Sequence, residues 1–158
     1  MTAQTWIAVV VGVAAVADDL ARRQIANWIP ALAFCSGLIL KSYSDGWRGA
    51  GASLLGTLAG AAVFLVFYLA GGMGGGDVKL MAGFGALLGT KLLLQAALWT
   101  AGCGGLMATA VIAGRYVRRV LQHAGSIQKD AGASGQTAET IPYAPAIAAG
   151  VWLALVPK

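Results

Sequence analysis

Residues 49–76 read GAGASLLGTLAGAAVFLVFYLAGGMGGG and contain no charged side chain. The apolar part of this stretch is long enough to cross a lipid bilayer as a helix, which takes about 20 apolar residues. Further uncharged stretches of similar or slightly smaller length occupy residues 1–17, 24–40, 92–114 and 140–157. Their spacing predicts an all-α integral membrane protein, a bundle of about six transmembrane helices.

The composition agrees with this fold class. Hydrophobic residues make up 58% of the 158 residues and charged residues only 11%, against about 25% charged in an ordinary soluble domain. The mean hydropathy is +0.74. Intrinsic disorder, a disulfide scaffold and a typical soluble enzyme are therefore excluded, and the length favours a single transmembrane domain over residues 1–158.

The charge balance is basic, with 11 Lys and Arg against 6 Asp and Glu. These bases lie in the connections between apolar stretches, where they set membrane topology. The expected surroundings are therefore the lipid bilayer, and no nucleic acid partner is expected. The first apolar stretch is expected to be retained rather than cleaved, because residues 1–6 carry no Lys or Arg.

The expected elements follow from the uncharged stretches. Helices are predicted at residues 5–19, 28–40, 50–69, 78–90, 92–114 and 141–155, with a loop at 41–48 and a polar loop at 115–140. The first half of that polar segment, residues 115–122, can instead extend the fifth helix. If alternate connections share one side, that side holds seven bases: Arg22, Arg23, Lys79, Arg115, Arg118, Arg119 and Lys129. The other side holds four: Lys41, Arg48, Lys91 and Lys158. The positive-inside rule places the first side, with the 115–140 loop, in the cytoplasm.

Three of the six acidic residues adjoin predicted helix ends on the base-rich side. Asp18 and Asp19 end the first helix, and Asp77 begins the fourth. Carboxylates at the edge of a membrane are costly and mark functional sites by default. The alternative is that they are solvated interfacial charges, or that Asp77 is only a helix N-cap.

Three glycines, Gly74 to Gly76, precede Asp77. Because they have almost no side-chain bulk, they allow a close approach by another segment or by an extended peptide, and they allow positive φ. Their spacing does not match a phosphate-binding loop. The alternative role is that of a hinge.

The sequence offers few other groups that could act in catalysis. The chain has one histidine, His123, no Gly-x-Ser-x-Gly sequence, and two cysteines, Cys35 and Cys103, outside any Cys-x-x-Cys pair. Neither a metal site nor a cofactor is expected. The remaining device is a pair of aspartates, in which one carboxylate activates water while its protonated partner polarises a peptide carbonyl.

Three segments resemble the type IV prepilin peptidases. Asp19-Leu20-Ala21-Arg22-Arg23-Gln24-Ile25-Ala26-Asn27 resembles their first sequence box, and Gly74-Gly75-Gly76-Asp77-Val78-Lys79-Leu80 resembles their second, the Gly-x-Gly-Asp motif of intramembrane aspartyl proteases. The segment from Ile141-Pro142-Tyr143 to Gly150 resembles their last helix. Ala26 replaces the proline of the first box, and no domain with two Cys-x-x-Cys pairs is present. The sequence is thus similar to the short form that serves tight-adherence (Flp-type) pili, without the methyltransferase domain.

The resemblance implies a catalytic role for Asp19 and Asp77. Asp19 rather than Asp18 fits the first box, because its distance to Asn27 matches the family pattern. Supporting positions in the two boxes are Gly74, Gly76, Lys79, Arg23 and Asn27, with no metal.

The implied substrate is a prepilin, cut after a glycine that ends a short basic leader and just ahead of its hydrophobic helix, at the cytoplasmic face of the bacterial inner membrane. Two alternatives remain: a proton- or ion-coupled small membrane protein, and a structural subunit of a pilus or secretion system.

Overall fold

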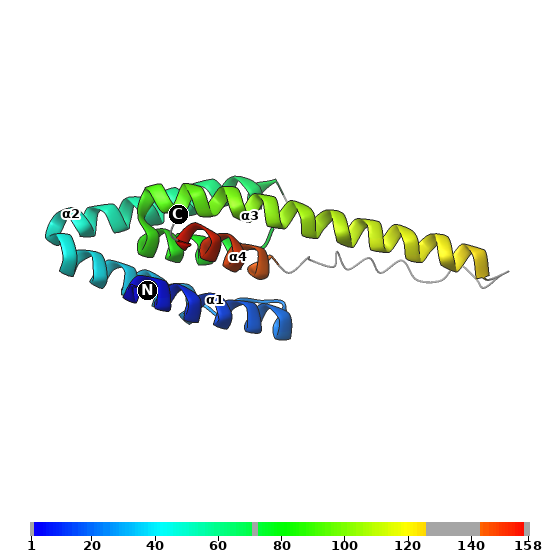
Figure 1. The fold of residues 1–158 in the computed structure, drawn as a ribbon, viewed down its shortest axis with the longest axis horizontal. Helices are drawn as coiled ribbons and strands as arrows, with labels where there is room; N and C mark the ends of the chain where they lie inside the picture. The colour runs from blue at the N-terminus through cyan, green and yellow to red at the C-terminus, as the bar shows by residue number, and fades with distance from the viewer. Residues whose placement is uncertain (1, 71–72, 126–142, 157–158) are drawn as a thin grey trace.

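The computed structural model describes residues 2–70, 73–125 and 143–156. In these ranges the chain forms four helices: α1 (Ala3–Arg22), α2 (Trp28–Leu69), α3 (Gly75–Gly125) and α4 (Ala144–Leu155) (Figure 1). The predicted all-α class is confirmed. The predicted count of about six helices is not confirmed, because these described residues form four.

The difference in count arises at two glycines. α2 bends at Gly46 (φ 57°, ψ −135°) and α3 bends at Gly89 (φ 74°, ψ 170°), and each helix continues on both sides of its bend. Glycine accepts such positive φ values without steric cost. The loop predicted at 41–48 is therefore wrong, since the chain needs only one non-helical residue to reverse there.

The polar loop predicted at 115–140 begins as helix. α3 stays helical through Gly125, and the remainder of that loop lies outside the described residues. The last helix begins at Ala144, and Ile141 and Pro142 lie outside the described residues as well.

Local sequence explains several helix starts. The Thr2 hydroxyl accepts a hydrogen bond from the Thr5 backbone N–H at 3.4 Å, which caps α1. Pro30 lies in the first turn of α2 and Pro145 in the first turn of α4. Proline is tolerated there because the N–H groups of a first turn have no partner within the helix.

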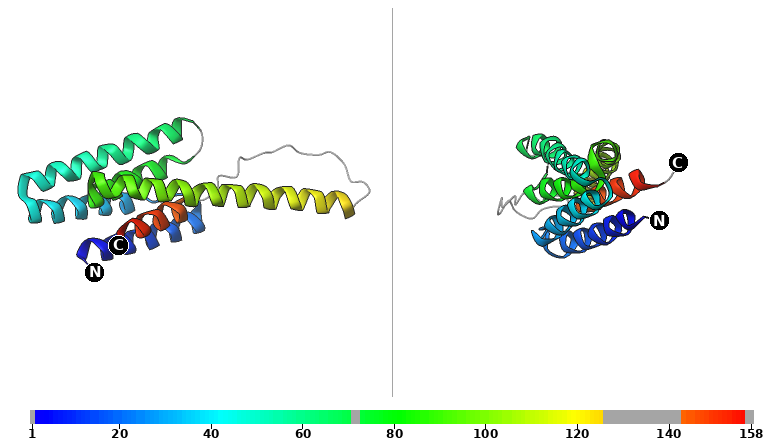
Figure 2. Two further views of the ribbon diagram at one scale, coloured as in Figure 1. Left: turned by 45° about the horizontal axis from the view of Figure 1, so that its top comes forward. Right: turned by 90° about the vertical axis from the view of Figure 1, so that its left-hand side faces the viewer.

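The centre of the bundle is the first part of α3, residues 75–88, held between the two halves of α2 (Figure 2). Glycines make this packing possible. A β-carbon on Gly56 or Gly85 would collide with the backbone of the other, and one on Gly37 would collide with the backbone of Leu87. Within this segment Leu80, Met81, Phe84 and Leu87 are fully buried and form much of the apolar core.

The bend at Gly89 leaves carbonyl groups without helical partners, and three distant side chains bond to them. Ser53 Oγ donates to the Ala86 carbonyl at 3.0 Å. Gln4 Nε2 donates to the Leu87 carbonyl at 2.9 Å, and Lys41 Nζ donates to the Leu88 carbonyl at 3.2 Å. Backbone groups that lack partners are costly in an apolar environment, so these bonds stabilise the bend.

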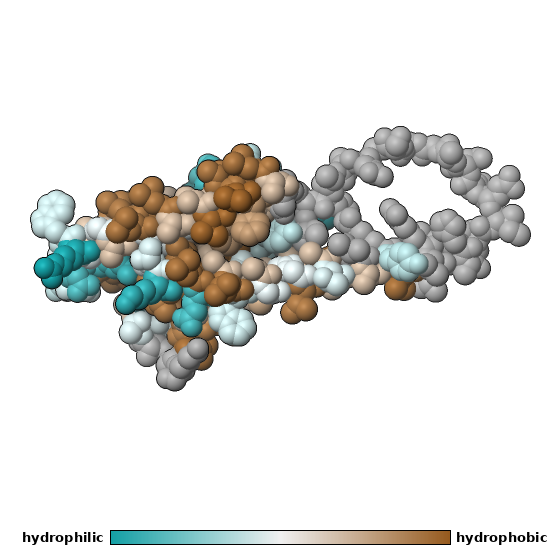
Figure 3. All heavy atoms as spheres, turned by 90° about the horizontal axis from the view of Figure 1, so that it is seen from above, coloured by the Kyte–Doolittle hydropathy of each residue, from teal (hydrophilic) through white to brown (hydrophobic). Residues whose placement is uncertain are grey.

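The outer surface of the bundle is strongly apolar. Large apolar side chains are exposed along α2, including Leu54, Leu55, Leu58, Val66 and Leu69, and Figure 3 shows such side chains spread over one face of the bundle. By length and composition, three helical stretches of the described residues can cross a membrane: Ala3–Arg22, Trp28–Leu69 and Gly75–Val111. This surface is that of a membrane protein.

α4 lies between α1 and α3. Trp152 Nε1 donates to the Ala8 carbonyl of α1 at 3.3 Å, and Gly150 lies directly against Thr100 and Ala96 of α3. Both termini lie toward one end of the bundle, while the end of α1 and the starts of α3 and α4 lie at the other (Figure 1).

We expect Gly85→Ala to destabilise the protein by about 1–3 kcal/mol, because its β-carbon would meet the Gly56 backbone and force the helices apart. Thermal unfolding in detergent measures this. Gly51→Ala is the matched control, since a β-carbon on Gly51 meets no atom within 4 Å. Equal unfolding temperatures for the two variants would contradict the packing described above.

Candidate active site

A polar cavity of about 370 Å³ lies where α1 ends and α3 begins. All seven residues predicted for the site line it, together with three neighbours: Asp19, Arg23, Gln24, Ile25, Asn27, Gly74, Gly75, Gly76, Asp77 and Lys79. The two boxes, which are far apart in the sequence, therefore come together at one end of the bundle.

Asp19 lies in the last turn of α1, with only 7% of its surface exposed. Its Oδ2 accepts a hydrogen bond from the Ala144 backbone N–H at 3.1 Å. Ala144 is the first residue of α4, and the residue at the N-cap position, Tyr143, makes no side-chain cap bond. Asp19 therefore caps α4 from a different helix, and the positive end of the α4 dipole faces its carboxylate.

Asp77 is the third residue of α3 and is also 7% exposed. Its Oδ2 accepts a hydrogen bond from the Gly74 backbone N–H at 3.1 Å, and its own N–H donates to the Gly74 carbonyl at 3.1 Å. Asp77 is thus not at the N-cap position, as the alternative interpretation required. It occupies the third helical position and bonds back to the residue before the helix, as the acid of a capping box does.

The adjacent acid, Asp18, has a different environment. Its Oδ2 accepts from the Ala26 backbone N–H at 2.7 Å, and its Oδ1 lies 3.5 Å from Arg22 Nε. It does not line the cavity. Asp18 therefore stabilises the turn after α1, while Asp19 faces the cavity and α4.

Arg23 ends α1 in the left-handed conformation, with φ 52° and ψ 30°. Its backbone N–H donates to the Asp19 carbonyl at 2.8 Å. Glycine is the usual residue at such a helix end, and a non-glycine residue costs about 1–2 kcal/mol there. The turn carries this strain at a position that directs residues 24–27 along the cavity.

Lys79 and Asn27 join the two boxes directly. Lys79 Nζ donates to Asn27 Oδ1 at 3.0 Å, on the exposed rim of the cavity. The sequence alone gave no sign of this pairing, because the partners are separated by the whole of α2.

The prediction that Gly74 to Gly76 allow positive φ requires a correction. Neither Gly74 nor Gly76 has positive φ; among the described glycines only Gly46 and Gly89 do. A β-carbon on Gly74 would lie 3.5 Å from Asp77 Oδ2, and one on Gly76 would lie 3.4 Å from the Ile25 side chain. These are ordinary contacts, so neither the backbone conformation nor the packing requires glycine at these two positions, and their lack of side chains leaves space in the cavity.

The hydrogen bond from the Ala144 backbone N–H to Asp19 could not be predicted from the sequence, because any residue type can supply a backbone donor. The available signal was the resemblance of residues 141–150 to a family helix, together with Pro145, which marks a helix start. Among the described residues there is no group of three or more His, Cys, Asp or Glu side chains that could hold a metal ion. Cys35 and Cys103 are both unpaired and lie outside the cavity.

Comparison with known proteins gives one consistent result. Residues 6–109 match the profile of the Type IV leader peptidase family. The chain is also 38% identical, over 127 residues, to a Bacillus subtilis protein named prepilin leader peptidase/N-methyltransferase. The match covers 78% of this chain and 42% of the relative, so the chain spans less than half of that relative's length. No solved structure matches this one.

We expect Lys79→Ala and Asn27→Ala to show a coupling of about 0.5–1 kcal/mol, since each removes the same hydrogen bond. A double-mutant cycle of thermal unfolding in detergent measures the coupling. Lys79→Ala combined with Gln4→Ala is the control cycle, because Gln4 bonds to Leu87 at the other end of the bundle. Additive losses in the first cycle would show that the Lys79–Asn27 bond contributes nothing.

We also expect Gly76→Ala to leave the unfolding temperature unchanged or slightly higher. The β-carbon would make an ordinary contact with Ile25, and alanine stabilises a helix relative to glycine by about 0.5–1 kcal/mol. Thermal unfolding beside the Gly85→Ala variant measures the contrast. A loss at residue 76 as large as that at residue 85 would show that the cavity wall is packed rather than open.

Proposed function

The chain belongs to the type IV leader peptidase family, and on that premise we propose that it is an intramembrane aspartyl endopeptidase that removes the leader peptide of type IV prepilins. Asp19 and Asp77 form the catalytic pair in this proposal. The observation that carries it is the convergence of both aspartates on one polar cavity at the end of an apolar bundle. We propose peptide cleavage alone and no methyltransferase activity.

The surroundings of the two aspartates suit a water-activating pair. Each carboxylate accepts a backbone hydrogen bond at the start of a helix, Asp19 from Ala144 and Asp77 from Gly74. These bonds orient the carboxylates, and both helix dipoles favour negative charge. Two carboxylates that share a site hold one proton between them, so one activates water while the other polarises the scissile carbonyl.

The glycine run suits an extended substrate. Gly74, Gly75 and Gly76 line the cavity beside Asp77 with no side-chain bulk. A peptide backbone in extended form can therefore lie close to the carboxylates, as hydrolysis requires. We propose a Flp-type prepilin with a short basic leader as the substrate, cut after a glycine.

We further propose that the cavity faces the cytoplasm from the bacterial inner membrane. Arg22, Arg23 and Lys79 lie at the cavity end of the bundle, whereas Lys41 lies at the end with the Gly89 bend. Together with the other bases of the 115–140 segment, this distribution follows the positive-inside rule.

Cleavage of a model prepilin in detergent tests the function. We expect Asp19→Asn and Asp77→Asn each to abolish cleavage, since each removes a titrating group and keeps its shape. Asp18→Asn is the matched control and should retain most activity, because its amide oxygen can still accept from Ala26 N–H.

The membrane level of each variant must equal that of the wild type. Full activity in Asp19→Asn with loss in Asp18→Asn would shift the catalytic position by one residue. Full activity in all three variants, or no cleavage by the wild type, would overturn the peptidase proposal and favour an ion-coupled or structural role.

The orientation is tested separately with reporter fusions. A reporter placed within residues 124–135 should be cytoplasmic, and one after Lys158 should be periplasmic, because the base-rich connections stay inside. The opposite pair of signals would place the cavity on the periplasmic side.

A further inference from the structure

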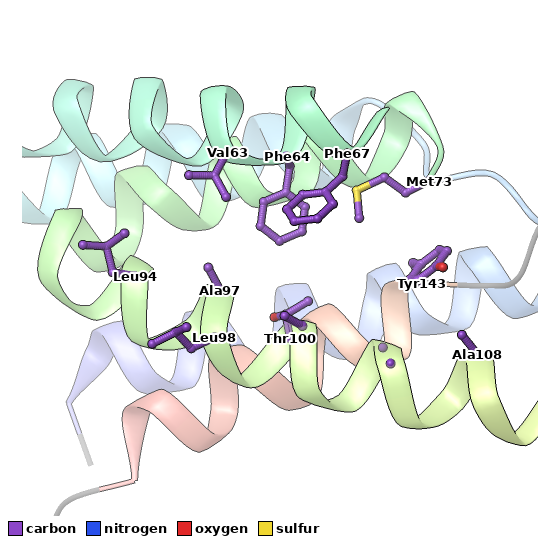
Figure 4. Close-up of a pocket in the computed structure, with 13 residues that line it drawn as sticks. Val63, Phe64, Phe67, Met73, Leu94, Ala97, Leu98, Thr100, Ala108 and Tyr143 are labelled. Atoms are coloured by element: carbon purple, nitrogen blue, oxygen red, sulfur yellow. The ribbon is translucent and has the colours of Figure 1, made fainter. Parts of the chain in front are cut away.

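A second, larger cavity lies between α2 and α3 and is almost entirely apolar. Its volume is about 580 Å³. Val63, Phe64 and Phe67 of α2 form one wall, and Leu94 and Leu98 of α3 form part of the other (Figure 4). Among the residues that the structure describes, no charged side chain lines it. We call it the apolar groove.

Two residues that line the apolar groove, Met73 and Tyr143, adjoin in the chain the residues whose N–H groups bond to the aspartates. Met73 and Tyr143 lie together at one end of the groove in Figure 4. Met73 immediately precedes Gly74, whose N–H bonds to Asp77, and Tyr143 immediately precedes Ala144, whose N–H bonds to Asp19. The groove therefore begins within one residue of both backbone groups that bond to the aspartates.

The α3 side of the groove is built from small residues at helical spacing: Ala97, Ala101, Gly104, Gly105 and Ala108. Such a stripe allows another helix to approach closely within a membrane. A β-carbon on Gly105 would meet no atom of the described residues within 4 Å, so they leave the groove open at that point.

We propose that the apolar groove receives the apolar helix of the substrate, on the C-terminal side of the cleaved bond. This inference rests on the proposed peptidase function. Substrate backbone that passes from the polar cavity into the hydrocarbon core of the bilayer must become helical, because unpaired N–H and C=O groups are costly there. The groove begins one residue from the backbone groups that bond to the aspartates, and its small-residue wall suits a helix rather than an extended chain.

Photo-cross-linking tests this directly. The probe is a full-length model precursor: a short basic leader that ends in glycine, followed by an apolar helix. A photoreactive residue replaces Gly105 in the Asp77→Asn variant, which holds the precursor uncleaved. The control position is Gly114, where a β-carbon also meets no atom within 4 Å in the part of the chain that the structure describes. Gly114 lies nine residues later, half a turn around the same helix, and so faces away from the groove.

We expect cross-links from position 105 to the apolar helix of the precursor and none from position 114. Cross-links from 105 to lipid alone, or equal yields from both positions, would overturn the inference. Cleavage of the same precursor by the wild type is measured in parallel. Its absence would refute the peptidase proposal, whereas cleavage without cross-linking at 105 would refute only the role of the groove.

A matched pair of variants gives a second readout. Gly105→Phe fills the groove, whereas Gly114→Phe does not. We expect kcat/KM for the full-length precursor to fall at least tenfold in Gly105→Phe, mainly through KM, and to stay within twofold of wild type in Gly114→Phe. Equal rates in the two variants would contradict occupation of the groove by substrate.

Discussion

The close packing of residues 75–88 between the two halves of α2 is the constraint on which the rest of the structure depends. It requires glycine where the backbones meet, on both sides at Gly56 and Gly85 and on the α2 side at Gly37, because a β-carbon at these positions would separate the backbones. It also requires the bend at Gly89, whose free carbonyls are bonded by Ser53, Gln4 and Lys41. With the segment fixed in this way, Asp77 in its first turn has a defined position at the end of the bundle.

The second aspartate depends on a different contact. Asp19 caps α4 in place of a local side chain, so its carboxylate is held by the helix that follows last in the sequence. α4 is in turn held by the close approach of Gly150 to Thr100 on α3. The site is thus shared by three helices, so packing far from the cavity contributes to the geometry of the two aspartates that we propose as the catalytic pair.

Much of this arrangement could be predicted from the sequence, because membrane helices and charged connections are strongly patterned. The helical class was predicted from charge spacing, and the resemblance of two short segments to a family identified the residues that line the polar cavity. The bends at Gly46 and Gly89 did not, since a single positive-φ glycine has no signature that separates it from the many other glycines here. The Lys79–Asn27 bond and the Ala144 donor were also not predictable, because each joins segments that only the folded chain brings together.

We propose that Asp19 and Asp77 act as one unit. The most direct measurement is the affinity for a precursor peptide in which a hydroxyethylene group replaces the scissile amide, since transition-state analogues bind at least about 100-fold tighter than substrates. We expect the wild type to bind the analogue more tightly than the substrate. Asp19→Asn or Asp77→Asn should each abolish this difference in affinity, and the double variant should bind the analogue no more weakly than either single variant. Losses that add up in the double variant, or an analogue that binds no tighter than the substrate itself, would contradict the proposal.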